Sequence, residues 1–137
     1  MLPDRSYPAK LLLFGEYSVI FGAEALAVPF PEFESNWTLN GLSGPSMEGF
    51  LNFLEKDPQY DLTELKALLT AGWTYSSNIP IGYGLGSSAA LVAAIYDACR
   101  VEKEQDVLEI KQSLATLESY FHGSSSGTDP LISYLNK

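Results

Sequence analysis

The stretch Ile-Pro-Ile-Gly-Tyr-Gly-Leu-Gly-Ser-Ser-Ala-Ala at residues 79–90 leads directly into an alanine-rich apolar segment, residues 89–98. Its small loop residues are Gly82, Gly84, Gly86, Ser87 and Ser88. Glycine allows a positive φ and lets a ligand approach the backbone closely. A helix that begins just after such a loop offers unpaired N–H groups and the positive end of its dipole. The stretch therefore predicts a phosphate cradle, with two serine hydroxyls placed to ligate a magnesium ion.

The same pattern is equally typical of a tight connection before a helix. It differs from a Walker A loop because no lysine follows the last glycine, Gly86. It also departs from the dinucleotide-binding fingerprint G-x-G-x-x-G, because position 87, where the last glycine would fall, is serine. The loop by itself leaves a nucleotide site and a plain turn both open, so other parts of the chain must decide.

Length, charge and cysteine content narrow the classes of protein. A chain of 137 residues with 46% hydrophobic and 18% charged residues is typical of one globular domain. The net charge of −9 argues against nucleic acid and anionic membrane surfaces as partners, although a glycine-rich nest can still attract a phosphate. The single cysteine, Cys99, reads as a small core residue and forms no internal disulfide. With no signal peptide and no apolar segment of membrane-spanning length, we expect a cytoplasmic protein.

Hydrophobic periodicity predicts short strands first and helices later. Apolar runs predict strands at residues 10–14, 17–21, 25–28, 37–39 and 73–78. Apolar residues at three-four spacing predict helices at residues 47–54, with Ser46 as N-cap, and at 62–69, 88–100 and 107–121. Gly72 and Gly123 follow the second and the last of these helices, where glycine commonly ends a helix. This order of elements indicates an α+β fold.

Three further places carry residues suited to chemistry, each with an ordinary structural alternative. Lys10 and Glu16 bracket an apolar strand, although such residues are more often found at the surface or in turns. Glu118 falls at the edge of the apolar face of the last helix and is either a solvated flank or a ligand aimed into a cleft. His122, one turn later, reads as a helix-end residue, because two ligands without a third make a poor metal site. Asp129 is either an Asx-turn former or a base for a substrate hydroxyl.

The order of these segments resembles the GHMP kinase superfamily, which includes galactokinase, homoserine kinase, mevalonate kinase and phosphomevalonate kinase. The resemblance spans nearly the whole chain and rests on residues 8–22, 80–90 and 118–129. Within the superfamily the chain is most similar to the mevalonate kinases. They share a similar Leu-Phe-Gly-Glu start, here at residues 13–16, and a stretch like His-Gly-Ser-Ser-Ser-Gly-Thr-Asp at residues 122–129.

The resemblance implies an α+β fold, with a sheet packed against helices as in the second domain of ribosomal protein S5. It implies ATP and Mg²⁺ as cofactors and transfer of the γ-phosphoryl group to a hydroxyl, with mevalonate 5-phosphate as the product. The residues implied to bind ATP are Pro80, Gly82, Gly84, Leu85, Gly86, Ser87, Ser88 and Ala89.

The same resemblance assigns the remaining roles. Ser88 and Glu118 would ligate Mg²⁺. Asp129 would take the proton of the attacking hydroxyl or orient that hydroxyl, and Lys10 would stabilise the developing alkoxide and keep Asp129 ionised. The residues implied to bind the acceptor are Lys10, Glu16, Tyr17 and Asp129. Phosphoryl transfer depends more on positioning and charge neutralisation than on covalent chemistry. These residues are of the types that such a reaction needs.

Two departures from the family pattern leave alternatives open. Mevalonate kinases usually have histidine after Gly-Glu, whereas Tyr17 stands here, as it does in some phosphomevalonate kinases. Family members also have a C-terminal domain with its own glycine-rich motif. We therefore expect residues 1–137 to be an N-terminal, ATP-binding domain, weakly active or inactive alone, whose exposed face is covered by the missing domain, a partner chain or a second copy. The alternatives are a phosphomevalonate kinase, a sugar kinase, or a non-catalytic protein for nucleotide sensing or subunit pairing.

Overall fold

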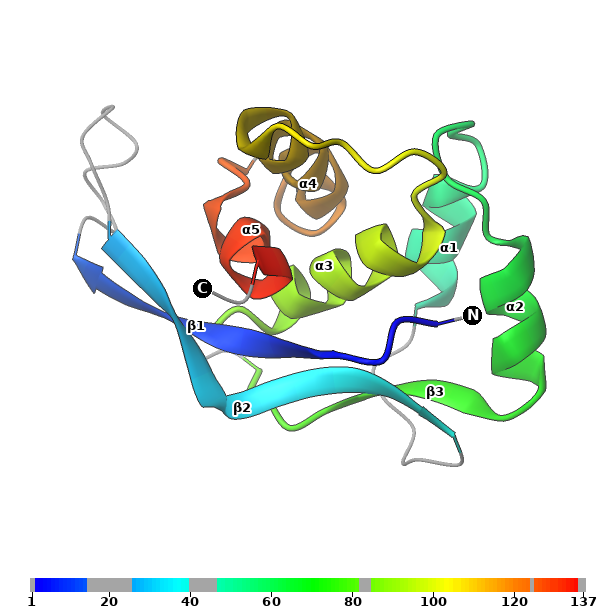
Figure 1. Ribbon diagram of the computed structural model, residues 1–137, viewed down its shortest axis with the longest axis horizontal. Helices are drawn as coiled ribbons and strands as arrows, with labels where there is room; N and C mark the ends of the chain where they lie inside the picture. Colours follow the sequence, from blue (N-terminus) through cyan, green and yellow to red (C-terminus); the bar gives the residue numbers. More distant parts are fainter. Residues whose placement is uncertain (1, 15–25, 40–46, 82–84, 124, 136–137) are drawn as a thin grey trace.

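The computed structural model describes residues 2–14, 26–39, 47–81, 85–123 and 125–135. Its elements in chain order are β1 (Ser6–Phe14), β2 (Leu26–Leu39), α1 (Glu48–Leu54), α2 (Thr63–Thr70), β3 (Trp73–Ser77), α3 (Ser87–Cys99), α4 (Val107–His122) and α5 (Thr128–Leu135). Figure 1 shows the strands as one layer and the helices on one side of it. This is the α+β arrangement that the sequence predicts.

The sheet consists of three antiparallel strands in the order β1-β2-β3. Between Pro8 and Ala9 of β1, the register jumps across residues 31–33 of β2, which form a bulge. The first bulged residue is a proline, which has no N–H to donate to the ladder. β2 bends sharply along its length (Figure 1), as expected of a bulged strand. The separate strands predicted at 25–28 and 37–39 are therefore parts of one bent strand.

Helix α3 lies at the centre of the fold. It packs on the sheet with one side, while α4 and α5 cover another (Figure 1). All of residues 89–96 are buried, and four of these eight residues are alanines. Because small side chains let neighbouring elements approach from every side, this composition suits a helix with no exposed face. The alanine-rich segment after the glycine loop is thus a core helix whose N-terminus is fixed by packing.

Glu104, in the connection between α3 and α4, holds the two helices together. Its carboxylate accepts hydrogen bonds from the Tyr96 hydroxyl at 2.9 Å and from the Arg100 guanidinium at 2.7 Å, both at the end of α3. Ser113 of α4 donates to the same carboxylate at 2.7 Å. Hydrogen bonds to a charged acceptor are stronger than neutral ones, so this cluster fixes α4 against α3.

Helix α5 is an element that our sequence analysis does not predict. Its first turn contains Pro130, at a position where a missing N–H costs no helical hydrogen bond. The carbonyl of Gly127 accepts from the N–H of Leu131 at 3.1 Å and begins the helical ladder. Asp129 therefore lies in the first turn of a helix and not in a free Asx-turn.

The predicted strand at 17–21 lies outside the described residues. The prediction of Ser46 as the N-cap is wrong, because α1 begins at Glu48 and its N-cap position is Met47, with no side-chain cap hydrogen bond. Cys99 is buried, as predicted for a small core residue, and burial raises the pKa of its thiol to about 12. Within the described ranges, none of the helices combines the length and the apolar character needed to cross a membrane.

The start of α5 leads to a prediction about two glycines with similar backbone conformations. Gly127 has φ of +81°, and a Cβ there would lie 2.2 Å from the carbonyl oxygen of Lys111. Gly123 has φ of +76°, and a Cβ there would meet nothing within 4 Å. Positive φ costs a non-glycine residue about 1–3 kcal/mol at either site. We expect Gly127→Ala to lose clearly more stability than Gly123→Ala in urea unfolding, because only Gly127→Ala also forces α4 and α5 apart. Equal losses would contradict the close approach of α5 to α4.

Candidate active site

Lys10 and Asp129 form an ion pair between the first strand and the last helix. The Lys10 side chain is 10% exposed, and its Nζ lies 3.2 Å from Oδ2 of Asp129, whose side chain is 37% exposed. A lysine shielded from water needs a paired anion, because an isolated buried charge is strongly unfavourable. The pair thus consists of a shielded Lys10 ammonium and an Asp129 carboxylate that a second molecule can reach.

The last two residues of the glycine-rich stretch, Leu85 and Gly86, lie against Lys10. The backbone N–H of Lys10 donates to the carbonyl of Leu85 at 2.9 Å, which ties β1 to the end of the loop. Gly86 has φ of +81°, and a Cβ there would lie 3.0 Å from Cγ of Lys10. The glycine therefore allows both the left-handed turn before α3 and close contact with the lysine's aliphatic stem. This contact places the N-terminus of α3 beside the ion pair.

The structure places the other predicted loop residues on either side of this contact. Ser87 and Ser88 are the first two residues of α3 and are half-buried, while Ala89 is buried. Pro80 is half-buried in the segment that leads into the loop. Gly82, Gly84, Glu16 and Tyr17 lie outside the described residues.

Glu118 of α4 is buried, with 6% of its surface exposed. Its carboxylate accepts a hydrogen bond from the Ser125 hydroxyl, which in turn accepts from the backbone N–H of Gly127 at 3.0 Å. Burial raises the pKa of Glu118 above its ordinary value, and the negative charge of Asp129 raises it further, while Ser125 and nearby positive charge lower it. Glu118 is thus a buried carboxylate that points into the fold and not a solvated flank. The charges of Lys10 and Asp129 both act on this carboxylate.

Ser88 and His122 join the start of α3 to the end of α4. Oγ of Ser88 lies 2.9 Å from Nε2 of His122, within hydrogen-bonding distance. The sequence analysis interprets His122 only as a helix-end residue and misses this contact. The spacing of His122 one helical turn after Glu118 places both residues on the same side of α4, but it carries no signal for a contact with Ser88 on another helix.

An apolar pocket borders the start of α3. It has a volume of about 180 Å³. It is lined by Tyr75, Ser77, Ile79, Ile81, Ser87, Ser88, Leu91 and Phe121. Ile81 is 77% exposed, although large apolar side chains rarely stand so far out of a folded surface without a use. The sequence analysis misses this pocket. The apolar residues Ile79 and Ile81, directly before the glycine-rich loop, are the signal that could have indicated it.

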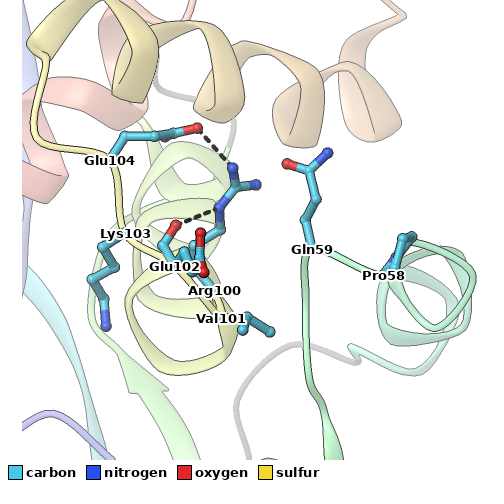
Figure 2. Close-up of a pocket in the computed structure, with 7 residues that line it drawn as sticks. All are labelled: Pro58, Gln59, Arg100, Val101, Glu102, Lys103 and Glu104. Atoms are coloured by element: carbon cyan, nitrogen blue, oxygen red, sulfur yellow. Dashed lines mark hydrogen bonds and ion pairs between the residues drawn. The ribbon is translucent and has the colours of Figure 1, made fainter.

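A larger cavity of about 490 Å³ lies at the other end of α3, where α3 connects to α4. Figure 2 shows Arg100 at its centre. The Arg100 guanidinium donates to Glu104 and to the carbonyl of Glu102, and Lys103 pairs with Asp97 at 3.8 Å. Both cations of this cavity are therefore already paired within the protein.

The donor set fits magnesium that arrives with a phosphate ligand. Among the residues that the structure describes, no three His, Cys, Asp or Glu side chains gather into a metal-binding group. Mg²⁺ usually takes one or two protein oxygens and completes its octahedron with phosphates and water. The Ser88 hydroxyl and the Glu118 carboxylate are hard oxygen ligands of this kind. Both lie close to His122: Ser88 is within hydrogen-bonding distance of it, and Glu118 precedes it by one turn of α4.

Comparison with known proteins gives a consistent result. A family model described as "GHMP kinases N terminal domain" matches residues 51–137. The mevalonate kinase of Archaeoglobus fulgidus is 31% identical over 141 residues, covering 93% of this chain and 49% of that protein. The mevalonate kinase of Pyrococcus abyssi is 28% identical over 161 residues, with 93% and 48% covered. The chain therefore spans about half the length of these curated relatives.

A solved structure supports the same similarity. The crystal structure of mevalonate kinase from methicillin-resistant Staphylococcus aureus superposes with a TM-score of 0.54 at 27% sequence identity. The match covers 96% of this chain and 50% of that chain. Together with the family model, it confirms the family resemblance and the fold that the sequence motifs imply.

The buried carboxylate of Glu118 predicts how stability depends on pH. Because its pKa is raised in the folded protein, the folded state holds this proton more tightly than the unfolded chain. The free energy of unfolding therefore falls as the pH rises through and above about 4.3, the ordinary value for glutamate. Glu118→Gln removes this penalty and keeps an acceptor for Ser125. We expect it to stabilise the chain by about 1 kcal/mol at pH 7, in the range typical of single stabilising substitutions. The gain should be much smaller at pH 4, where the glutamate carboxyl is largely protonated in both states.

Urea unfolding at the two pH values measures this difference. Glu109→Gln is the matched control, because Glu109 is an exposed glutamate on the same helix. A Glu118→Gln variant that is less stable than the wild type at pH 7 would show that the ionised carboxylate stabilises the fold, contrary to our account.

Proposed function

This chain belongs to the GHMP kinase family, and from that membership we propose that it carries the ATP-binding half of a small-molecule kinase. The reaction is transfer of the γ-phosphoryl group of ATP to a hydroxyl, with mevalonate as acceptor and mevalonate 5-phosphate as product. The observation that supports this most directly is the Lys10–Asp129 pair at 3.2 Å, lying against a glycine loop at the N-terminus of a core helix.

The loop and α3 bind the phosphates in this proposal. The first turn of a helix presents unpaired N–H groups and a positive dipole end, which favour a phosphate. Gly86, Ser87 and Ser88 stand at this position, and the loop residues Gly82 and Gly84 complete the predicted cradle. The apolar pocket beside Ser87 and Ser88 suits the nucleobase, which needs a flat apolar surface.

Lys10 and Asp129 act on the acceptor hydroxyl. Asp129 accepts the hydroxyl proton, or orients the hydroxyl, as the nucleophile approaches phosphorus. The Lys10 ammonium neutralises the negative charge that develops on the acceptor oxygen, from a position fixed before the substrate binds. Because Lys10 is shielded from water, its charge acts more strongly there than at an exposed site.

Ser88 and Glu118 hold magnesium in this proposal. When bound, Mg²⁺ neutralises charge on the β- and γ-phosphates during transfer. Ser88 reaches this position from the start of α3, and Glu118 from the last part of α4. The burial of Glu118 favours a cation beside it, because an ionised carboxylate out of water needs a positive partner.

The acceptor and the domain organisation belong to the same proposal. The curated relatives are mevalonate kinases, which favours mevalonate, whereas Tyr17 favours phosphomevalonate as the second candidate. Residues 1–137 act as the N-terminal domain, and a C-terminal domain or partner chain completes the site. The coverage supports this part of the proposal, since the chain matches about half of each relative.

Phosphorylation assays with mevalonate, phosphomevalonate and galactose test the proposal. They are run on the 137-residue chain and on any longer form of the protein. We expect mevalonate to be the best acceptor and Asp129→Ala to lower kcat at least about 100-fold, the usual contribution of a positioned base. Asp129→Asn, which keeps the shape and loses the charge, is expected to lose activity to a similar extent, while Glu109→Gln is expected to retain it.

Two outcomes would count against the proposal. Turnover that survives in both Asp129 variants would remove the assigned role of this carboxylate. ATP binding without turnover of any acceptor by the longer form would favour the non-catalytic alternative, a nucleotide-sensing or subunit-pairing protein.

A further inference from the structure

The hydrogen bond between Ser88 and His122 has no role in the function described above. We propose that His122 is a positioning residue. Its ring accepts a hydrogen bond from the Ser88 hydroxyl and so turns the oxygen lone pairs of Ser88 toward magnesium. The inference rests on the proposed function, because it assigns Ser88 to the metal that accompanies ATP.

The chemistry of a hydroxyl ligand motivates this assignment. A serine hydroxyl has one proton and two lone pairs, and a neutral imidazole has one nitrogen that accepts a hydrogen bond. When the oxygen gives a lone pair to a metal, its proton must point away from the metal toward an acceptor. Nε2 of His122 lies 2.9 Å from Oγ of Ser88 and can be that acceptor. Partners of this kind orient metal ligands and raise their basicity.

The fold holds His122 in place without burying it. His122 is in the last turn of α4, and the N–H of the next residue, Gly123, closes the helix by donating to the carbonyl of Ser119 at 2.8 Å. The neighbouring Phe121 packs against Phe50 of α1, with ring centroids 5.0 Å apart. The His122 side chain itself is exposed, so replacing it removes no core packing.

One helix thus supplies both a metal ligand and the partner of another. Glu118 and His122 are one turn apart on α4, whereas Ser88 comes from α3. Because α4 packs on α3, the last turn of α4 positions the Ser88 hydroxyl relative to the Glu118 carboxylate. In the reverse arrangement, His122 would donate to Ser88 and occupy one of its two lone pairs, and the hydroxyl proton would be left without this acceptor and free to point toward the metal. The two arrangements have opposite effects on metal binding.

Calorimetric titration with ATP separates them. Mg·ATP and metal-free ATP are each titrated into the wild type, His122→Ala, His122→Gln and Ser88→Ala, and into the double variant of Ser88→Ala with His122→Ala. We expect His122→Ala to weaken Mg·ATP binding about 10–100-fold, the usual effect of removing a partner of a metal ligand, and to leave metal-free ATP binding unchanged. His122→Gln is expected to bind within about threefold of the wild type, because its side-chain carbonyl also accepts a hydrogen bond.

The double variant shows whether the effect passes through the hydroxyl. We expect His122→Ala to have no further effect once Ser88 is alanine, because coupled residues are not additive. Mg·ATP binding by His122→Ala that equals or exceeds that of the wild type would overturn the inference. So would an equal loss with and without magnesium. If the wild type binds neither form of ATP, the proposed function itself fails, and the inference fails with it.

The tautomer of the imidazole gives a second readout that does not depend on activity. The chain contains one histidine, so its ring nitrogens give an unambiguous ¹⁵N spectrum. We expect the neutral ring to carry its proton on Nδ1 and to leave Nε2 as acceptor, and we expect Ser88→Ala to change this preference. A proton on Nε2 in the wild type would contradict the assignment.

Discussion

Lys10 and Asp129 belong to the first strand and the last helix of the described chain, and the 3.2 Å contact between them brings the site together. Lys10 can stay shielded from water only while a carboxylate faces it. That carboxylate is in place only if α5 packs against the sheet. The close packing of α5 on α4 requires glycine at position 127, just before α5 begins at Thr128, because a side chain there would meet the backbone of α4. The ion pair therefore couples the placement of the charged groups to the packing of the domain.

The site carries an energetic cost that the core compensates. Glu118 is buried at a position where its charge is unfavourable, and the cluster around it is assembled from four elements. Helix α3, buried from residue 89 to residue 96, provides the apolar contact that holds these elements together. A cation beside this carboxylate would relieve the cost, which is the role that we propose for magnesium.

Local patterns predicted some parts of this structure and could not predict others. The left-handed turn at Gly86, the core helix α3 after it and the amphipathic α4 follow from glycine content and three-four spacing, which are local properties. β2 was divided into two strands because the bulge at residues 31–33 interrupts the alternation. Helix α5 has only eight residues, so its formation depends on tertiary packing and not on local propensity. The contact between Ser88 and His122 depends on how two helices cross, which a single sequence does not encode locally.

A crystal structure of the protein with Mg²⁺ and a non-hydrolysable ATP analogue tests the central claim most directly. Our account predicts the γ-phosphate at the N-terminus of α3, with magnesium on Ser88 and Glu118 and the acceptor side facing Lys10 and Asp129. An analogue bound elsewhere, such as in the cavity around Arg100 at the opposite end of α3, would contradict it.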